Sequence, residues 1–172
     1  MAPEALVESV PAEVLHREIS GLGVTHILTV PDTHQKSLLA SLSVDDAFSY
    51  HVLSTEDEAL CVNAGLWMGG KEPLVIIQNV GLFAAMNALR GVAMDLRVPT
   101  CMLVGQYARD VTVPVPANNN SAVRLIESVL ATLDVPCYVI DRADQVSMIP
   151  DAFARSREER RPVVVLISAP TA

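Results

Sequence analysis

The sequence predicts an α/β fold: a single domain with a six-stranded, mostly parallel sheet and helices on both of its faces. Short β-branched runs alternate along the chain with longer segments of helical periodicity. The strand runs are almost continuously hydrophobic, as is typical of strands buried on both faces. The composition is 51% hydrophobic and only 19% charged, which also indicates apolar surface that partner chains cover.

The first elements of this pattern are a helix at 11–19 and a strand at 24–30, with the sequence VTHILTV. Asp32 or Thr33 follows this strand. Either side chain suits the N-cap of a helix that runs to about Ser43.

The second strand is expected at 48–53, and Ser54-Thr55 suits the N-cap of a helix that runs to about Met68. Two glycines at 69–70 then turn the chain. Pro73 opens a third strand with the sequence LVIIQ.

A loop at 79–81 and a helix to about Met94 are expected after the third strand. The rest of the chain alternates in the same way, with strands at 99–104, 136–140 and 162–168 and helices at 118–133 and 143–156. The stretch 105–116 (GQYARDVTVPVP) is too polar and proline-bearing for either element. Loops of this length in a compact domain are usually functional or interfacial.

The charge and the cysteines exclude several classes of function. A net charge of −8 argues against nucleic acid or an anionic membrane as a partner. The most apolar stretch, 74–94, is interrupted by polar residues and is not expected to span a membrane. The first ten residues lack the pattern of a secretory signal, so a cytoplasmic protein is expected. The cysteines lack metal-ligand spacing and are expected to be reduced, packed thiols: Cys61, Cys101 and Cys137.

A parallel sheet of this kind binds ligands beyond the carboxyl ends of its strands. The strand ends that carry polar residues are at 31–34, 54–58, 78–81 and 105–110. We therefore expect the candidate site at this edge of the sheet.

Three acids, Glu56, Asp57 and Glu58, open the helix that follows the second strand. Acids in a first helical turn interact favourably with the helix dipole, which is a sufficient structural explanation. The same helix continues through Ala59–Gly65, which is small and apolar on every side and predicts burial. A buried acid at its start would suit acid–base chemistry on a heterocycle. Both explanations remain open at this point.

A set of motifs in a fixed order carries a family resemblance. The set resembles the pyrimidine-binding domain of thiamine-diphosphate-dependent decarboxylases, in particular the α subunit of sulfopyruvate decarboxylase and the matching half of phosphonopyruvate decarboxylase. The resemblance covers essentially the whole chain. Its motifs are Thr29-Val-Pro-Asp-Thr-His34, Glu56–Gly65, Gly70-Lys-Glu-Pro73, Gln78-Asn79, Gly81-Leu82 and Asn87-Ala-Leu89.

The resemblance implies cofactor contacts. Glu56, nine residues before Gly65, has the position of the acid that hydrogen-bonds the pyrimidine nitrogen and promotes the imino tautomer of the cofactor. Pro31, Gln78 and Asn79 are expected to contact the cofactor as well. Glu58 faces away around the helix and is expected to have a capping or surface role.

The resemblance also implies substrate contacts at Thr33, His34 and Gln78. After the fourth strand the relatives usually have Trp-Arg-Gly where this chain has Gln106-Tyr-Ala-Arg109, and Arg109 is still expected to supply a cation. The simpler alternatives are that Thr33 caps a helix, that His34 is solvated, and that the amide of Gln78 satisfies a loop. The relatives usually have Ser-Gly-Leu-Gly-Asn where this chain has Val80-Gly-Leu-Phe83-Ala. Because two polar groups are lost there, a less charged 2-oxo acid is expected, with Phe83 in its pocket.

The 172 residues contain no Gly-Asp-Gly motif, with which this family begins its diphosphate-binding domain. The run Asn118-Asn119-Asn120 is expected to cap a helix instead. Residues 1–172 are therefore expected to form one pyrimidine-binding domain without metal ligands. The resemblance then implies a separate β subunit that holds the diphosphate and Mg²⁺, in an α₂β₂-type assembly. A carboligase subunit and a non-catalytic interaction subunit remain alternatives to a decarboxylase subunit.

Overall fold

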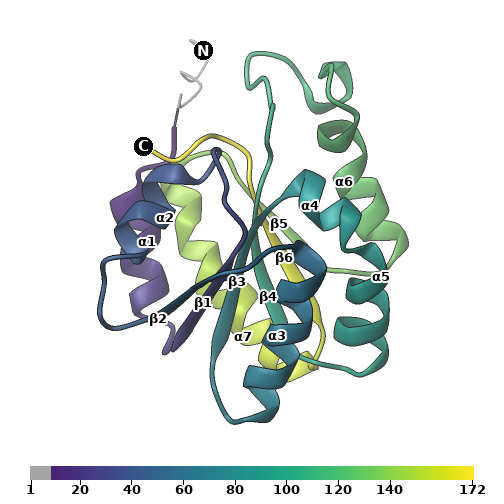
Figure 1. The fold of residues 1–172 in the computed structure, drawn as a ribbon. Helices are drawn as coiled ribbons and strands as arrows, with labels where there is room; N and C mark the ends of the chain where they lie inside the picture. The colour runs from purple at the N-terminus through teal and green to yellow at the C-terminus, as the bar shows by residue number, and fades with distance from the viewer. Residues whose placement is uncertain (1–8) are drawn as a thin grey trace.

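The computed structural model describes residues 9–172 and confirms the α/β prediction: one six-stranded sheet, parallel throughout, with helices on both faces (Figure 1). The strand order is β2-β1-β3-β4-β6-β5. The expected absence of a secretory signal concerns residues that lie largely outside the described ones. The strands are β1 (His26–Thr29), β2 (Ser49–Val52), β3 (Pro73–Gln78), β4 (Thr100–Gly105), β5 (Cys137–Ile140) and β6 (Pro162–Ile167).

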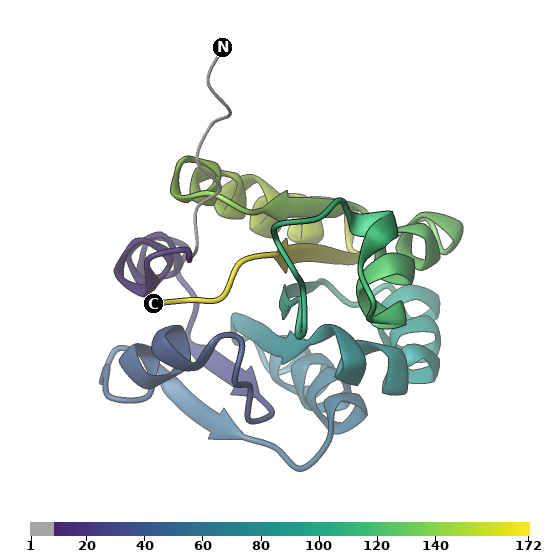
Figure 2. The same cartoon turned by 90° about the horizontal axis from the view of Figure 1, so that it is seen from above.

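Helices α1, α2 and α7 cover one face of the sheet, and α3 to α6 cover the other (Figure 2). Within residues 9–172, no helix is long and apolar enough to cross a membrane. The α-helices are α1 (Ala12–Ser20), α2 (Lys36–Leu42), α3 (Glu56–Met68), α4 (Asn79–Ala84), α5 (Met86–Ala88), α6 (Ser121–Thr132) and α7 (Ile149–Glu159). A π-helix, η1 (Leu89–Asp95), and two 3₁₀-helices, η2 (Val115–Ala117) and η3 (Ala143–Met148), complete the elements.

Alternating side chains of the strands form two separate cores. In β1, Ile27 packs in the core with α1, α2 and α7, whereas Leu28 packs in the core with α3, α4 and α6. In β4, Leu103 and Met102 divide in the same way. Burying a side chain of this size stabilises the fold by roughly 1.5–3 kcal/mol. The strands therefore read as continuous hydrophobic runs because both of their faces are covered.

The strand order fixes where loops diverge at the carboxyl edge of the sheet. The chain leaves β1 to one side to form β2 and returns to the other side to form β3. The loops after β1 and β3 therefore run in opposite directions from the carboxyl ends of these strands. Ligands bind at such a position in open α/β sheets.

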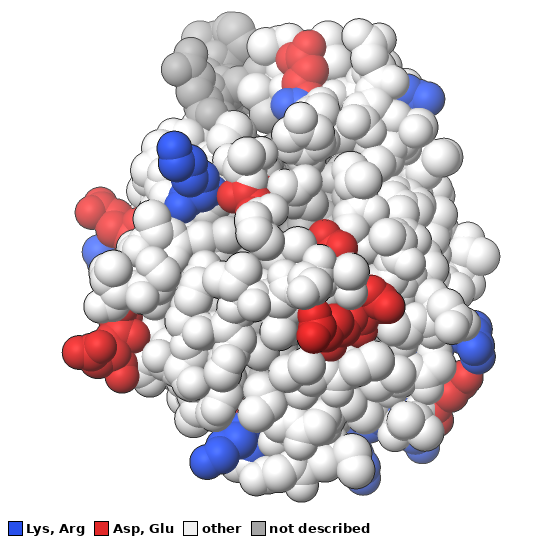
Figure 3. All heavy atoms as spheres, viewed as in Figure 1, with Lys and Arg blue, Asp and Glu red and all other residues white. Residues whose placement is uncertain are grey.

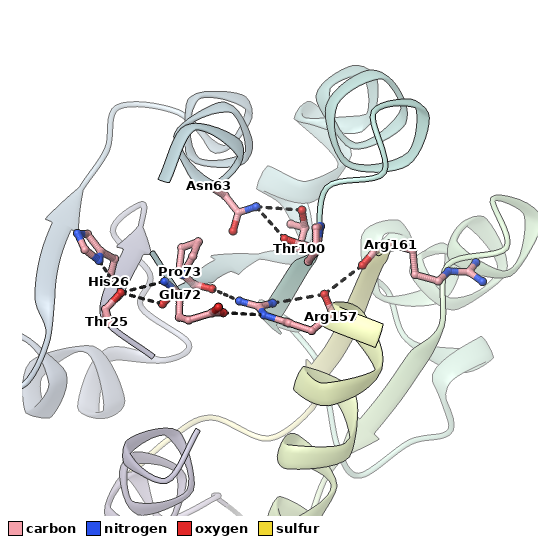
Figure 4. A network of polar contacts seen from close by, with 10 residues as sticks. Thr25, His26, Asn63, Glu72, Pro73, Thr100, Arg157 and Arg161 are labelled. Atoms are coloured by element: carbon pink, nitrogen blue, oxygen red, sulfur yellow. Dashed lines mark hydrogen bonds and ion pairs between the residues drawn. The ribbon is translucent and has the colours of Figure 1, made fainter. Parts of the chain in front are cut away.

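The opposite, amino edge is held by a polar network around Arg157 of α7 (Figure 4). Its guanidinium donates to Glu72 Oε2 (3.1 Å) and to the Pro73 carbonyl oxygen (2.7 Å), and it lies 3.8 Å from the centre of the Phe153 ring. Burial lowers the pKa of Arg157, an effect that the hydrogen bond to Glu72 opposes. In the same region Asn63 Nδ2 donates to Thr100 Oγ1 (3.0 Å), which joins α3 to β4.

Two predicted helix starts are wrong. Asp32 and Thr33 do not cap α2: Asp32 Oδ1 accepts the His34 backbone N–H (2.7 Å) in a local turn, and the helix begins only at Lys36. The loop expected at 79–81 is instead the first turn of α4, which begins directly after β3.

Two later helices also start after their predicted positions. Helix α6 begins at Ser121, where Asn120 caps it by accepting the Ala122 backbone N–H (2.8 Å), while Asn118 accepts the Asp110 N–H and holds the preceding loop. The stretch after β5 begins as the 3₁₀-helix η3. It becomes α-helical only at Ile149, with proline in the first turn, where a missing N–H costs nothing.

The expectation of three packed thiols is correct only in part. The three cysteines are free. Burial raises the pKa of the Cys101 thiol to about 12, and that of the partly buried Cys137 to about 12. Cys61, in contrast, is exposed on α3. The segment Ala59–Gly65 of this helix is mostly apolar, but no other part of residues 9–172 covers its outer side.

Candidate functional site

The start of α3 is fixed by a cap that uses Glu58 and leaves Glu56 free. Thr55 occupies the N-cap, and its Oγ1 accepts the Glu58 backbone N–H (3.4 Å). Glu58 Oε2 accepts the Ser54 backbone N–H (2.8 Å). The capping role predicted for Glu58 is therefore confirmed.

Glu56 packs against the first turn of α4. Its side chain is half-buried, and a Cβ atom on Gly81 would overlap its carboxylate. Only glycine at position 81 leaves room for this contact. The structure thus joins two motifs that lie 25 residues apart in the sequence, one at the end of β2 and the other at the end of β3.

The outer side of α3 is apolar and exposed in this chain. Cys61, Gly65 and Met68 lie three or four residues apart and form one exposed stripe, in which Met68 is 75% exposed. The prediction that this helix is buried on every side is wrong for the single chain. Figure 3 shows acidic side chains near the middle of this face, within a mostly uncharged surface. Such a face is typical of an interface.

Asn79 presents a buried donor in the first turn of α4, two residues before Gly81. Its side chain is completely buried, and its Oδ1 accepts the Val80 backbone N–H (2.9 Å). Its Nδ2 has no hydrogen-bond partner among the described residues. A buried donor without a partner costs about 1–3 kcal/mol, so this amide is suited to receive an acceptor from a ligand. Gln78, the last residue of β3, is half-buried beside it.

The loop after β1 separates the residues predicted to bind substrate. Pro31 and Thr33 are exposed, whereas His34 is buried. His34 Nε2 donates to the Ile167 carbonyl oxygen (2.9 Å), and burial lowers the pKa of this histidine, which keeps it neutral. The structure therefore uses His34 to tie the loop to β6.

A buried polar cluster beneath this loop has no counterpart among the predicted site residues. Gln35 Nε2 donates to Asp32 Oδ2 (2.9 Å) and to the Ile77 carbonyl oxygen (3.1 Å), and Gln35 Oε1 has no partner among the described residues. Gly105, at the end of β4, makes room for the cluster: a Cβ there would lie 2.9 Å from Asp32 Oδ2. The signal in the sequence was the glycine that ends an otherwise bulky strand.

The cation predicted at Arg109 is engaged within its own loop. Arg109 Nη1 donates to the carbonyl oxygens of Asp110 and Val113. Next to this loop, the Ser168 hydroxyl donates to Gln106 Oε1, while the buried Gln106 Nε2 has no partner among the described residues. The loop after β4 therefore contributes an amide to the carboxyl edge, and its arginine serves to shape the loop.

Phe83 lies on α4 with Val80, and both line a small cavity that faces α6. Within residues 9–172, no group of three or more histidine, cysteine or acidic side chains is arranged to hold a metal ion. The residues gathered at this edge thus include the acids Glu56 and Asp32, several amides and apolar side chains.

Comparisons with known proteins bear on this arrangement. No family model matches the sequence. The chain is 23% identical over 162 residues to the sulfopyruvate decarboxylase subunit alpha of Methanococcus maripaludis, covering 92% of this chain and 94% of that protein. It is 23% identical over 161 residues to the sulfopyruvate decarboxylase of Methanosarcina acetivorans, covering 92% of this chain and 40% of that protein. The chain is a relative of these decarboxylases. The family resemblance of the motifs is confirmed.

Solved structures confirm the fold. The benzoylformate decarboxylase of Polynucleobacter necessarius superimposes with a TM-score of 0.68 at 20% identity, over 92% of this chain and 29% of that chain. A Mycobacterium smegmatis protein, described as thiamin diphosphate-dependent, superimposes with a TM-score of 0.68 at 22% identity, over 95% of this chain and 32% of that chain. The chain thus spans about a third of the length of these structures.

Proposed function

We propose that this chain is the pyrimidine-binding α subunit of a two-component, thiamine-diphosphate-dependent 2-oxo acid decarboxylase, and that Glu56 activates the cofactor. The observation that carries the proposal is the packing of Glu56 against Gly81 at the carboxyl edge of the sheet, in a chain related to decarboxylases. This contact joins two of the motifs that carry the family resemblance, the Glu56–Gly65 segment and Gly81-Leu82.

The residues at this edge fit the pyrimidine part of the cofactor. Glu56 offers a carboxyl group in a half-buried position, and Asn79 offers a buried donor that has no partner within residues 9–172. An acid and an amide of this kind match the ring nitrogens and the amino group of an aminopyrimidine. Pro31 and Gln78 would complete the contacts. Mg²⁺ is usually held by several oxygen ligands, and within residues 9–172 no cluster of acids, histidines or cysteines is arranged for a metal ion; the proposal therefore gives the diphosphate and Mg²⁺ to a partner subunit.

The roles of this chain's residues follow from their positions. Thiamine diphosphate, when bound, supplies the nucleophile and the electron sink for loss of CO₂. Glu56 holds and returns a proton at its carboxyl group, and Asn79 orients the ring through a hydrogen bond.

The lengths of the relatives support a two-component enzyme. The chain covers 94% of a relative named as a subunit alpha, but only 40% of a sulfopyruvate decarboxylase whose name carries no subunit label. In the proposed assembly, a β subunit supplies what the remainder of the longer chain supplies. The exposed apolar stripe on α3 suits such a partner, because no other part of residues 9–172 covers it. An α₂β₂-type complex with a small 2-oxo acid substrate is the assembly that we propose.

The decisive experiment compares Glu56→Gln with Glu58→Gln in the reconstituted complex, which can be obtained by co-purifying the partner with a tagged chain. The measured quantity is exchange of the cofactor's C2 proton with deuterium, because it reports activation without substrate. We expect Glu56→Gln to slow exchange by about 10²–10⁴-fold, the typical contribution of general acid–base catalysis. Glu58→Gln is the matched control, because it changes the same functional group two residues away in the cap.

The outcomes separate the candidate functions. Slow exchange in Glu56→Gln alone supports the proposal. Slow exchange in Glu58→Gln alone would move the role to the capping residue, and wild-type exchange in both variants would leave the chain a scaffold. Analysis of the products then distinguishes decarboxylation from carboligation.

A second experiment tests the partner through Cys61. In the isolated chain this exposed thiol should react with iodoacetamide, while Cys101 and Cys137 should resist because burial raises the pKa of each to about 12. In the complex, we expect Cys61 to become protected. Unchanged labelling of Cys61 in an active complex would show that the partner docks elsewhere.

A further inference from the structure

The residues proposed to contact the cofactor and the substrate lie beyond the hydrogen-bonded part of the sheet. The parallel pairing of β1 with β3 ends at Thr29 and Ile76. The loop at 31–33 follows this pair on one strand, and residues 78–79 follow it on the other. Because the chain leaves the two strands in opposite directions, the pairing of the strands does not set the distance between these segments.

Gln35 bridges these two segments through its side-chain amide. Its Nε2 donates one hydrogen bond to Asp32 Oδ2 (2.9 Å), in the loop after β1, and another to the carbonyl oxygen of Ile77 (3.1 Å), next to Gln78. Gln35 is completely buried, and Asp32 is 6% exposed. An amide nitrogen carries two hydrogens, so this one uses both, and water cannot easily replace the donor at either acceptor.

Two neighbouring strands hold this bridge in place. Asp32 Oδ1 accepts the His34 backbone N–H (2.7 Å), and His34 Nε2 donates to the carbonyl oxygen of Ile167 (2.9 Å) at the end of β6. Gly105, at the end of β4, lies against the bridge: a Cβ there would lie 2.9 Å from Asp32 Oδ2 and 3.1 Å from Gln35 Nε2. One added methyl group at position 105 would therefore force the bridge to move.

We propose that Gln35 is a positioning residue, which holds the loop of Pro31 and Thr33 at a fixed distance from Gln78 and Asn79, so that both segments contact the same ligand. The inference rests on the proposed function and adds to it a residue that does not itself touch the cofactor. The alternative is that the amide of Gln35 only stabilises the fold.

Asn63 offers a matched control, because it has the same chemistry at the opposite edge of the sheet. It is completely buried, and its Nδ2 donates to the carbonyl oxygen of Pro99 (3.2 Å) and to Thr100 Oγ1 (3.0 Å). The side-chain oxygens of Asn63 and Gln35 both lack a partner among the described residues. Gln35→Met and Asn63→Leu each remove two buried hydrogen bonds at nearly constant volume, so each should lower the stability of the isolated chain.

Two measurements separate positioning from stability. In the isolated chain, backbone amide hydrogen exchange of residues 31–35 should be faster in Gln35→Met than in wild type, and unchanged in Asn63→Leu. In the reconstituted complex, exchange of the cofactor's C2 proton is followed at increasing concentrations of thiamine diphosphate. We expect Gln35→Met to raise the half-saturating concentration by about 10-fold or more, because a displacement of about 1 Å can cost about 10²-fold. The rate at saturation should stay near that of wild type, because Glu56 contacts Gly81 independently of the bridge.

A second variant, Gly105→Ala, displaces the bridge from β4 while it keeps Gln35, and it should act in the same way. If Gln35→Met does not fold, Gly105→Ala decides between the same outcomes. An unchanged half-saturating concentration in the folded variants would overturn the positioning role, and so would wild-type amide exchange of residues 31–35. An equal rise in Asn63→Leu would overturn it in favour of a general effect of stability. C2-proton exchange that does not depend on Glu56 would instead contradict the proposed function, and amide exchange in the isolated chain would still test the bridge.

Discussion

The two edges of the sheet contain similar polar residues, but these differ in how fully they are hydrogen-bonded. At the amino edge, Arg157 pairs with Glu72 and with the Pro73 carbonyl oxygen, and Asn63 ties α3 to β4 (Figure 4). At the carboxyl edge, buried amide atoms lack partners among the described residues: Gln35 Oε1, Asn79 Nδ2 and Gln106 Nε2. One unpaired acceptor, Asn63 Oδ1, breaks the pattern at the amino edge.

The difference indicates that the amino edge stabilises the fold and that the carboxyl edge binds a ligand. Unpaired buried polar groups cost stability, so their concentration at one edge is expected where a ligand completes them. Glycines support the same conclusion: Gly81 and Gly105 both make room for side chains at the carboxyl edge. Substitutions at this edge should therefore change activity more than stability, and substitutions at the amino edge should do the reverse.

The largest effect is expected from Gly81→Ala. The added methyl group would overlap the Glu56 carboxylate and force that side chain to move, while alanine itself suits a helix. We expect C2-proton exchange in the complex to fall by about 10²–10⁴-fold, as for loss of Glu56 itself. Thermal unfolding should show a stability change within about 1 kcal/mol.

The control for this substitution is Gly91→Ala, because a Cβ at Gly91 would meet no atom within 4 Å. It should leave exchange unchanged. If Gly81→Ala exchanged at the wild-type rate, the Glu56–Gly81 contact would have no functional importance, and the comparison between the edges would lose its main support.

The next largest effect is expected from Arg157→Ala at the amino edge. This change leaves the Pro73 carbonyl oxygen and Glu72 without their donor and removes the stacking on Phe153. Because Glu72 is partly exposed and can be rehydrated, we expect a loss of about 2–3 kcal/mol in the free energy of unfolding. Chemical denaturation measures it. C2-proton exchange in the folded complex should be unchanged, and a large loss of exchange would contradict this difference between the edges.

Much of the fold could be predicted from the sequence, because unbroken hydrophobic runs indicate strands that are buried on both faces. The runs at β3, β4 and β6 are hydrophobic on both faces, which only a covered parallel sheet explains. Helix starts were predicted less well because local hydrogen bonds compete there. Asp32 forms a turn with His34, which delays α2, and Asn79 enters α4 directly, where a loop was expected.

The candidate site could be located from the sequence but not assembled from it. Glu56 and Asn79 were predicted from motif order, and the structure brings their elements together at one edge. The contact between Glu56 and Gly81 depends on how α3 packs on α4, and this packing cannot be predicted from local sequence patterns. Arg109 shows the opposite case: its charge indicated a substrate contact, but nearby carbonyl oxygens bind its guanidinium.

A smaller effect is expected from pH, through His34. Burial lowers the pKa of His34 below its ordinary value of 6.5, so the unfolded chain binds more protons than the folded chain as the pH falls through that value. Stability should therefore fall between pH 7 and pH 5, by at most about 1.4 kcal/mol per pH unit from this group. The measurement is the free energy of unfolding at several pH values for wild type and His34→Gln.

The control for the pH dependence is His26→Gln at the other edge. Burial, His51 and Lys71 lower the pKa of His26, so it contributes a slope of the same sign. We expect His34→Gln to reduce the slope more, because His34 is the more deeply buried histidine. An unchanged slope in His34→Gln would show that this residue titrates alike in the folded and unfolded chains.

The smallest effect is expected from Thr55→Ala, which removes the N-cap of α3. The hydrogen bond from the Glu58 backbone N–H to Thr55 Oγ1 is long, at 3.4 Å, and Glu58 also secures the start of the helix through the Ser54 N–H. We therefore expect a loss near the lower end for N-caps, about 0.5 kcal/mol in the free energy of unfolding. Thr55→Ser, which keeps the hydroxyl, is the control. C2-proton exchange in the complex should change less than in Gly81→Ala, because α4 rather than the cap positions the Glu56 carboxylate. If Thr55→Ala slowed exchange as much as Gly81→Ala does, the cap would position Glu56, and the contact with α4 would be secondary.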